Sequence, residues 1–426
     1  MQANAYSIIA ATCYGNRGAE AMLETVVGRL AEAGPGSRFH VFTYYPADDR
    51  RLVGDDRIEL HSSTPLALVA WLLPWALVFG LLRLLFGRRV LRFGPRSIRA
   101  LGESVALADL AGVSFIDGRE KFLPFNLLTL LPAWLLGTPV VKLSQAMGPF
   151  KNAANRLLAG FMLPRCAMVW ARGARTFEHL QSSGFDGMRY LQADDIAFNH
   201  RDAYSLSGEA PPELDAVLGA VAAYRQGGGR GVIGLCPSSV VSVKSRKEGG
   251  HYDAVLAKLV DELSGRGFLV VLFPNATRAV SGEAERNNDL PLIRRVMQAA
   301  KVAAGGPGPV ACDADVNAAS IKRIIAATDV VIVSRFHAMV GALSLEVPSV
   351  VLGWSHKYAE VMARFGLEQH VLDYKAVAID DLRRRVEGVF EQRMAIRSAI
   401  AQRLPEVKAS AARPVDGLLQ PPGFGA

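Results

Sequence analysis

Arg335 and His337 are the residues of this chain whose types and placement most clearly suggest chemistry. They flank Phe336 directly after the apolar run DVVIV, which ends at Val333, and a small-residue segment, AMVGALSLE, follows them. This pattern predicts a buried strand, a turn and a helix. Open α/β sheets bind ligands at the carboxyl ends of their strands, and the amino end of a helix adds partial positive charge there. We therefore expect an anion site with a titratable imidazole beside it.

A plainer interpretation of the same two residues is structural. In that interpretation Arg335 pairs with a carboxylate of the core, and His337 caps the helix that follows. A short Arg-x-His pattern does not decide between the two interpretations by itself. The elements that position the pair, and the other segments of the chain, have to be considered.

Strands and helices are predicted to alternate along most of the chain. Residues 6–13, YSIIAATC, form an apolar strand, and a Gly-containing turn, an amphipathic helix and the strand RFHVFTYY follow. Strand, turn, helix and strand in that order indicate a parallel sheet. A second series of this kind starts at GVIGLC, after the Gly run at 227–229. We predict an α/β chain of two Rossmann-like doubly wound domains that face each other across a cleft, a GT-B-like architecture.

The predicted organisation has four parts. The length of 426 residues favours more than one domain. The alternation is lost between residues 201 and 230, which we interpret as a linker. The parts are an N-terminal Rossmann-like domain at 1–200 with an apolar, Arg-rich insertion at 62–99, the linker at 201–230, a C-terminal Rossmann-like domain at 231–375, and a C-terminal helix and tail at 376–426.

The insertion at 62–99 suggests contact with a membrane. Residues 62–82 include no charged side chain, and six arginines follow between residues 83 and 99. The length suits a membrane span, and basic flanks favour the cytoplasmic side. However, Pro65 and Pro74 interrupt the run, and a span would put the two parts of one domain on opposite sides. We expect a helix or hairpin lying in the cytoplasmic leaflet, with a span or a pair of buried core helices as the alternatives.

Composition narrows the class of protein further. The net charge of +8 favours anionic partners. Four cysteines that lie far apart in the sequence predict buried thiols instead of a disulfide framework or a zinc site.

No glycine fingerprint follows the first strand, so a nicotinamide enzyme is not predicted. No metal-ligand cluster is visible in the sequence, and no cofactor is expected. The N-terminus has no basic leader, so we expect a cytoplasmic protein on the cytoplasmic face of the membrane.

Five segments, in order, resemble the polysaccharide pyruvyl transferase family. The last carries the most specific signature, Arg-x-His followed by Ala, Gly-x-Pro and an aromatic-x-x-Lys, with Glu346 in place of the usual Gly. In the second segment Ser144 replaces a family Gly. The segments are NRGAEAM at 16–22, LSQAMGPF at 143–150, VWARGARTFEHLQSSGF at 169–185, ADDIAF at 193–198 and SRFHAMVGALSLEVPSVVLGWSHK at 334–357.

The resemblance implies a transferase that moves a pyruvyl group from phosphoenolpyruvate to two hydroxyls of a sugar. The product is a ketal, and the expected acceptor is a surface polysaccharide or its lipid-linked precursor; nucleic acid is not an expected partner. The donor carries a phosphate and a carboxylate, so it needs at least two cationic groups. We expect Arg335 and Arg172 to bind the donor across the cleft and His337 to protonate its vinyl carbon. The other predicted substrate-binding residues are Lys357, Gln145, Asn16, Glu20 and Asp195.

Departures from the family pattern keep other functions in view. The family has a Gly-Gly pair in the region that corresponds to residues 108–122, for which Gly118 is the counterpart here. Gly173 also replaces the usual Asp after Arg172. The alternatives are a sugar-nucleotide glycosyltransferase of the same two-domain architecture and a non-catalytic scaffold of polysaccharide biosynthesis or export.

Overall fold

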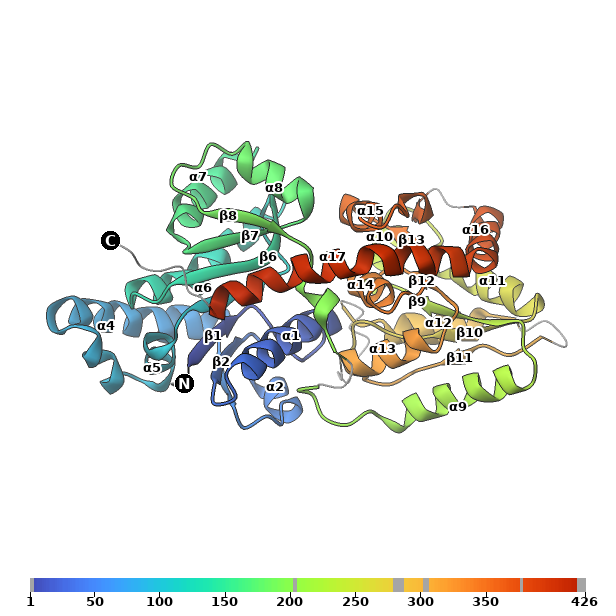
Figure 1. The fold of residues 1–426 in the computed structure, drawn as a ribbon, viewed down its shortest axis with the longest axis horizontal. Helices are drawn as coiled ribbons and strands as arrows, with labels where there is room; N and C mark the ends of the chain where they lie inside the picture. The colour runs from blue at the N-terminus through green and yellow to red at the C-terminus, as the bar shows by residue number, and fades with distance from the viewer. Residues whose placement is uncertain (1–3, 202–204, 279–286, 302–305, 376–377, 420–426) are drawn as a thin grey trace. The chain divides into compact units, whose positions relative to one another are not determined.

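The chain divides into two units by its residue contacts. The computed structural model describes residues 4–201, 205–278, 287–301, 306–375 and 378–419 (Figure 1). Unit 1 comprises Met1–Cys13, Met22–His200 and Lys408–Ala426, and unit 2 comprises Tyr14–Ala21 and Arg201–Val407. The turn that follows the first strand therefore clusters with the C-terminal half of the chain.

Unit 1 is built on a parallel sheet of eight strands. Their order is β3-β2-β1-β4-β6-β7-β8, and β5 pairs with β6. The central strands are almost entirely buried, as expected where helices cover both faces of a parallel sheet. The strands are β1 (Ala5–Ile9), β2 (Arg38–Thr43), β3 (Ile58–Ser62), β4 (Leu107–Asp109), β5 (Val113–Ile116), β6 (Val140–Gly148), β7 (Met168–Arg172) and β8 (Tyr190–Ala193).

Unit 2 has a parallel sheet of six strands in the Rossmann order. The order β11-β10-β9-β12-β13-β14 reverses direction between β9 and β12, and this reversal is the topological switch point. All residues of β9, β10, β12 and β13 are buried, as expected for strands made mostly of Val, Ile, Leu and Phe with a few small residues. The strands are β9 (Gly231–Cys236), β10 (Phe268–Leu272), β11 (Val310–Ala311), β12 (Val330–Val333), β13 (Ser349–Gly353) and β14 (Val371–Asp373). Both halves are thus Rossmann-like, as the sequence predicted.

Helices connect the strands in both units. The longer ones of the first half are α1 (Arg17–Ala33), α2 (Pro46–Leu52), α4 (Leu73–Phe86), α5 (Arg96–Glu103), α6 (Leu123–Leu135), α7 (Ala153–Met162) and α8 (Gly173–Gln181). Those of the second half are α9 (Pro212–Gln226), α10 (Ser239–Lys247), α11 (Tyr252–Gly265), α12 (Leu290–Ala299), α13 (Ala318–Ala326), α14 (Phe336–Ser344), α15 (His356–Ala363), α16 (Ile379–Glu391) and α17 (Arg393–Leu419). The short helices are α3 (Pro65–Ala67), η1 (Leu68–Leu72), η2 (Arg88–Phe93), η3 (Glu120–Phe122), η4 (Leu163–Arg165), η5 (Ile196–Asn199) and η6 (Glu368–His370).

Two segments are more regular than the sequence predicted. The stretch 201–230, interpreted as a linker, contains the 15-residue helix α9 and belongs to unit 2. The predicted C-terminal helix and tail form α16 and α17; α17 clusters with unit 2 up to Val407 and with unit 1 from Lys408. Residues 376–377 and 420–426 of the predicted tail lie outside the described residues.

The apolar insertion forms one continuous helical segment, Pro65–Phe86. It is long and apolar enough to cross a membrane by length and composition, the criteria that a buried core helix also meets. Pro65 starts the segment after the capping residue Thr64, and a π-helical turn at Leu68–Leu72 precedes Pro74. The two prolines therefore lie at helix starts, where a missing N–H is tolerated, and the run is not broken.

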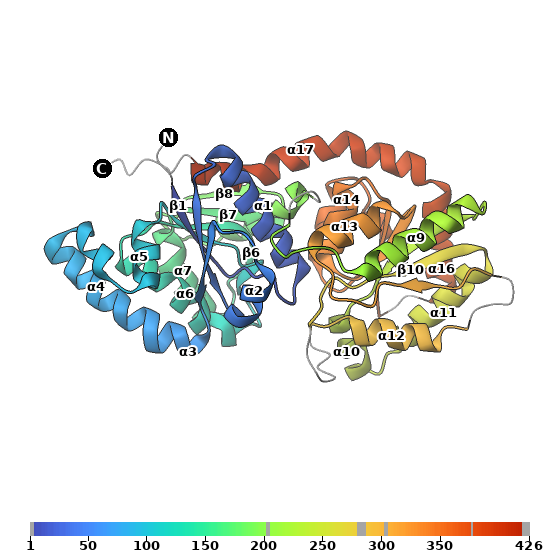
Figure 2. The same ribbon diagram turned by 90° about the horizontal axis from the view of Figure 1, so that it is seen from below.

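Only one face of this segment packs against the rest of unit 1. Figure 2 shows α4 at one end of unit 1, beside α5. Leu68, Leu72, Ala76 and Phe79 are buried and recur at helical spacing. Just 28% of the most apolar window is buried, so a pair of buried core helices does not describe it. The exposed apolar residues of the segment are Leu66, Val69, Trp71, Leu77, Val78, Leu81, Leu84, Leu85 and Phe86.

Ser144 and Glu346, which replace family glycines, both adopt left-handed backbone conformations. Their φ values are +46° and +60°. At the end of α14, the amide of Val347 donates to the Ala342 carbonyl, and the amide of Glu346 donates to that of Leu343. This is the Schellman arrangement, whose left-handed position favours glycine. A family glycine at position 346 is therefore explained by the backbone and not by ligand binding.

The exchange Glu346→Gly is expected to stabilise the protein. A side chain in the left-handed region costs about 1–2 kcal/mol, and the greater freedom of glycine in the unfolded chain offsets part of that gain. We expect a net increase of roughly 0.5–1 kcal/mol in the free energy of unfolding, measured by thermal or urea denaturation. Glu346→Ala is the matched control, since it removes the same carboxylate and keeps the strain. An equal gain in both variants would contradict the backbone explanation.

Candidate active site

The switch point of unit 2 brings two strand ends and two helix starts together. Strands β9 and β12 are neighbours, and α10 and α14 begin shortly after them. Ser238 caps α10 through a hydrogen bond from the amide of Val241 to its hydroxyl. Arg335 stands immediately before the first residue of α14. This edge is where doubly wound sheets bind ligands, and both helix starts favour an anion.

Asp289 organises this edge. Its carboxylate is fully buried and accepts hydrogen bonds from three backbone amides, those of Ser239 at 2.9 Å, Asn275 at 3.2 Å and Ala276 at 2.9 Å. It also forms a two-pronged ion pair with Arg335, whose Nε lies 3.0 Å from Oδ2. The loops after β9, β10 and β12 are thus held by one carboxylate.

Arg335 is a mostly buried cation, with 14% of its side chain exposed and part of its guanidinium uncommitted. Nε and Nη2 donate to Asp289, and Nη2 also donates to the Ser239 hydroxyl at 2.9 Å. Nη1 makes no hydrogen bond within the described part of the chain. Burial lowers the pKa of the guanidinium, but the Asp289 charge outweighs burial and raises it. The structural interpretation, pairing with a core carboxylate, is therefore confirmed, and it leaves one nitrogen for a ligand.

Two tyrosines fix the turn that carries Arg335. The Tyr252 hydroxyl donates to Ser334 Oγ at 2.7 Å, and the Tyr358 hydroxyl donates to the Ser334 carbonyl at 3.0 Å. Burial raises the pKa of both phenols, so both remain protonated donors at neutral pH. The guanidinium is therefore presented from a turn with little freedom to move.

His337, the second residue of α14, is half-buried beside the N-terminal turn. A Cβ atom placed on Gly18 would lie 2.0 Å from the imidazole Nδ1, so only glycine fits there. Asn16 shapes the same turn, because its side-chain oxygen accepts from the amides of Gly18 at 3.1 Å and Ala19 at 3.4 Å. Asn16 therefore caps the start of α1. Its turn lies beside His337, the predicted acid, and both belong to unit 2.

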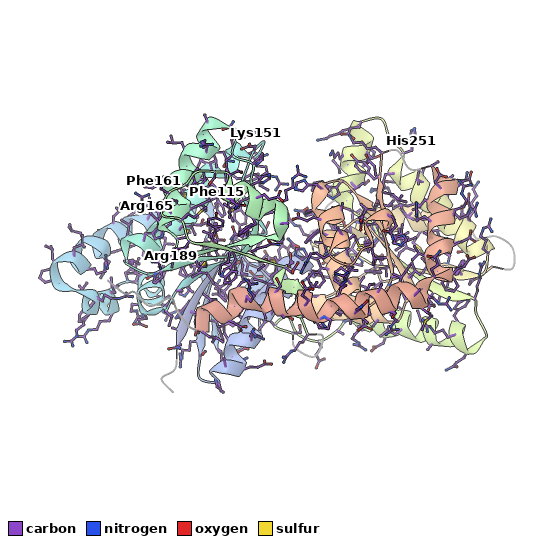
Figure 3. All side chains as sticks on the ribbon, turned by 45° about the horizontal axis from the view of Figure 1, so that its top comes forward. Phe115, Lys151, Phe161, Arg165, Arg189 and His251 are labelled. Atoms are coloured by element: carbon purple, nitrogen blue, oxygen red, sulfur yellow. The ribbon has the colours of Figure 1, made fainter. Side chains whose placement is uncertain are left out.

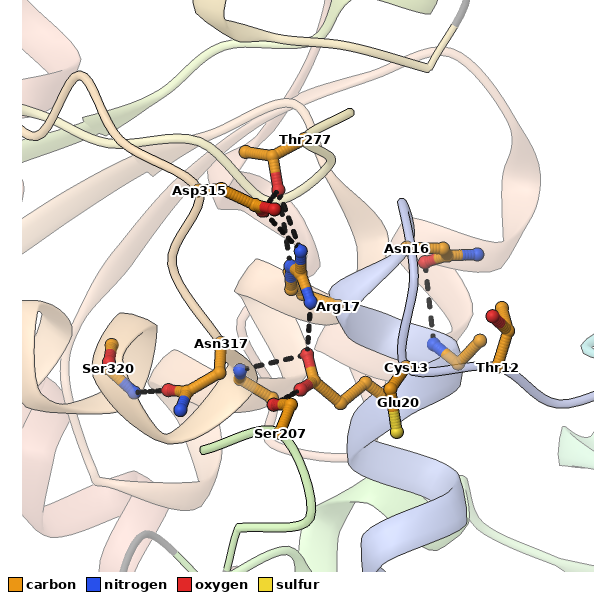
Figure 4. A network of polar contacts seen from close by, with 12 residues as sticks. Thr12, Cys13, Asn16, Arg17, Glu20, Ser207, Thr277, Asp315, Asn317 and Ser320 are labelled. Atoms are coloured by element: carbon orange, nitrogen blue, oxygen red, sulfur yellow. Dashed lines mark hydrogen bonds and ion pairs between the residues drawn. The ribbon is translucent and has the colours of Figure 1, made fainter. Parts of the chain in front are cut away.

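Glu20 belongs to a buried polar network that the sequence did not reveal (Figure 4). One of its oxygens accepts from Arg17 at 2.9 Å and from the Ala318 amide at 3.1 Å, and the other accepts from Ser207. Arg17 also pairs with Asp315. Burial lowers the Arg17 pKa, but Glu20 and Asp315 outweigh burial and raise it. We assign Glu20 to positioning the N-terminal turn, since both its oxygens are engaged within unit 2.

Lys357 lies in the first turn of α15, against three aromatic rings. Its ammonium is 4.6 Å from the ring centre of Phe336, 5.2 Å from that of Trp354 and 5.5 Å from that of Tyr358. Cation–π contacts at such distances orient a lysine without neutralising its charge. Lys357 therefore contacts the ring of Phe336, the residue between Arg335 and His337.

Arg172, Asp195 and Gln145 lie in unit 1. Arg172 ends β7 and leads directly into α8. Its Nη1 donates to Asp195 at 2.8 Å, and both side chains are buried. The chain also has Gly112, overlooked in the sequence, whose added Cβ would lie 4.0 Å from the same nitrogen. Asp195 therefore holds the Arg172 guanidinium at the end of β7.

Gln145 is a buried link between two strand ends. It donates to the Asp109 carbonyl at 2.8 Å and accepts from the Ser114 hydroxyl at 2.7 Å. A buried ion pair between Lys142 and Asp109, which sequence reasoning missed, lies on the neighbouring residues of β6 and β4. These contacts give Gln145 a positioning role within the sheet of unit 1.

Grouping the predicted residues by unit separates them into two sets. Unit 2 contains Asn16, Glu20, Arg335, His337 and Lys357, and unit 1 contains Arg172, Gln145 and Asp195. All four cysteines are buried thiols, as predicted. The residues missed by sequence reasoning are mostly buried partners of those it found: Asp289, Ser239, Arg17, Asp315, Lys142 and Asp109.

Comparison with known proteins supports the sequence resemblance. A family model described as polysaccharide pyruvyl transferase matches residues 16–356. The fold resembles that of the UDP-GlcNAc 2-epimerase from Neisseria meningitidis, with a TM-score of 0.55 and 11% identity over 98% of this chain and 100% of that one. It also resembles sucrose-phosphate synthase from Thermosynechococcus elongatus, with a TM-score of 0.54 and 10% identity over 98% of this chain and 97% of that one. At such identities the structural likenesses concern the fold alone.

Proposed function

The chain belongs to the polysaccharide pyruvyl transferase family, and from that membership we propose that it transfers the pyruvyl group of phosphoenolpyruvate to a sugar. The proposed acceptor is a surface polysaccharide or its lipid-linked precursor. The observation that carries the proposal is Arg335, a guanidinium fixed at a topological switch point with Nη1 left for a ligand and His337 two residues away.

The proposed reaction needs a cation for the donor and an acid for its vinyl carbon. Protonation of C3 of phosphoenolpyruvate generates an oxocarbenium-like centre at C2, which one sugar hydroxyl attacks. A second hydroxyl then displaces phosphate from C2 and closes the ketal. Of the two protons lost by the hydroxyls, one balances the proton added to C3 and the other leaves with phosphate. The net products are the ketal and inorganic phosphate.

The contacts in unit 2 support a role for each of three residues in this reaction. Arg335 binds an anionic group of the donor through Nη1, with its other nitrogens held by Asp289 and Ser239. His337 supplies the proton to C3. Lys357, oriented by its aromatic neighbours, contributes a second positive charge for the donor or for a phosphate of the acceptor. Arg172 of unit 1 remains our proposal for a further cationic contact with the donor.

Ligand-dependent stability tests the donor. A ligand at about 100 times its dissociation constant stabilises the folded state by roughly 2.7 kcal/mol. We expect phosphoenolpyruvate, and not UDP-GlcNAc, to raise the unfolding temperature of the wild type. His337→Gln should keep that rise and lose at least about a hundredfold in phosphate release from phosphoenolpyruvate with a membrane extract as acceptor. A rise with UDP-GlcNAc alone would favour the glycosyltransferase alternative, and no rise with either ligand would favour the scaffold.

We also propose that the protein works at the cytoplasmic face of a membrane, through the segment Pro65–Phe86. Its exposed leucines continue to the end of α4, where Leu84, Leu85 and Phe86 are 74%, 66% and 70% exposed. Arg89 and Arg92, both exposed, follow directly and suit anionic headgroups. The exposed face of this segment can be buried in the outer part of a leaflet without the helix crossing the membrane. This location brings the enzyme to a lipid-linked acceptor.

Sedimentation with vesicles tests the membrane contact. The triple variant of Leu81→Glu, Leu84→Glu and Leu85→Glu should lose at least about tenfold in affinity for vesicles of phosphatidylglycerol and phosphatidylethanolamine, since each buried leucine contributes about 1.5–3 kcal/mol. Leu191→Glu, at an exposed leucine of β8, is the control and should bind as the wild type does. Equal binding by the triple variant would refute this contact.

A further inference from the structure

Three potential metal ligands meet on the edge of the sheet of unit 1. His40 lies on β2, and Glu59 and His61 lie on the edge strand β3. The parallel register pairs His40 with Glu59 and Phe42 with His61. Glu59 and His61 are two residues apart, so both side chains point to the same face of the strand. The sequence showed no such cluster because Glu59 lies 19 positions after His40, and only the strand pairing brings them together.

Two of the three distances between the ligand atoms match those of a tetrahedral metal, and His61 Nε2 lies 3.9 Å from the other carboxylate oxygen of Glu59. His40 Nδ1 lies 3.3 Å from His61 Nε2 and 3.3 Å from a carboxylate oxygen of Glu59. One candidate atom from each residue can be chosen so that all three lie within 4.8 Å of one another. Two ligands at about 2.0–2.1 Å from one tetrahedral ion are about 3.3–3.4 Å apart. Two of the three edges therefore already have the length that a bound ion imposes.

Neighbouring side chains orient the His61 imidazole and set the charge around both histidines. The charged groups that act on them are Glu59, Glu103 and Arg38 around His40, and Glu59 and Arg96 around His61. Phe42 stacks on the His61 ring at 4.8 Å and fixes its plane. An imidazole whose ring plane is already fixed is suited to bind a metal.

A cavity opens beside two of the three ligands. It has a volume of 640 Å³, and its lining includes Glu59, His61, Arg50, Arg96 and Trp71. The three residues supply three protein ligands, the number found in zinc sites that keep one position for a water or another ligand. The cavity lies beside two of these ligands, and its arginines favour an oxygen anion.

We propose that His40, Glu59 and His61 form a site for one divalent transition-metal ion, with zinc-like preference and a coordination position open to this cavity. The donor set of two nitrogens and a carboxylate suits Zn²⁺ and Co²⁺ and does not suit Mg²⁺, which demands oxygen ligands. The site does not depend on the proposed transfer of pyruvate, because none of its three residues is assigned to that reaction.

Cobalt titration of the full chain, purified with a chelator and then freed of it, tests the site. We expect one Co²⁺ per chain, with visible absorption bands of a tetrahedral ion, displacement by Zn²⁺ and no competition from Mg²⁺. His40→Ala and His61→Ala should each weaken binding at least about tenfold. Glu59→Gln is tested beside each histidine variant. The Glu59 side chain is 48% exposed, so its exchange leaves the sheet intact.

The control variant is His251→Ala. His251 is exposed and lies in unit 2, before α11 (Figure 3). It should bind Co²⁺ as the wild type does. The proposal is overturned if the wild type binds no stoichiometric Co²⁺, if His251→Ala weakens binding as much as His61→Ala does, or if Glu59→Gln and both histidine variants bind with wild-type affinity.

Discussion

The buried pair of Asp289 and Arg335 is the interaction on which the arrangement of unit 2 depends. Removing one partner of such a pair typically costs about 3–5 kcal/mol, because the other charge stays buried without compensation. Asp289 also binds three backbone amides from the loops after β9 and β10, so the same carboxylate fixes the loops and the guanidinium. A cation that is itself held in this way can meet an anionic ligand without first giving up conformational freedom.

A second buried network extends this order to the start of the chain. Arg17 and Glu20 tie the first turn of α1 to Asp315 and to the start of α13, all within unit 2. Gly18 then lies against His337 with no room for a side chain. The motif that resembles the family's opening turn therefore has a physical explanation. It places a close-packed backbone beside the imidazole, and its charged residues, Arg17 and Glu20, hold that backbone in position.

How much the sequence could predict depended on whether the signal was local. The apolar strand before Arg335 and the small-residue helix after it are local patterns, and both were predicted correctly. Asp289 lies 46 residues before Arg335, and nothing in its neighbourhood marks it as a partner. His40 and Glu59 are joined only by strand register.

The sequence favours a linker at 201–230 because its Pro and Gly residues outweigh the periodicity of α9. Ser144 and Glu346 carry no sign of their left-handed backbone except their departure from the family glycines.

The central claim is that Arg335 uses one side of its guanidinium for Asp289 and the remaining nitrogen for the donor. Calorimetric titration with phosphoenolpyruvate of the wild type and of Arg335→Lys tests it most directly. Lysine keeps a positive charge for Asp289 but lacks the fork that serves two partners at once. The account predicts that the wild type binds one phosphoenolpyruvate per chain and that the folded Arg335→Lys variant binds it at least about tenfold more weakly. Equal dissociation constants, or no binding by the wild type, would contradict it.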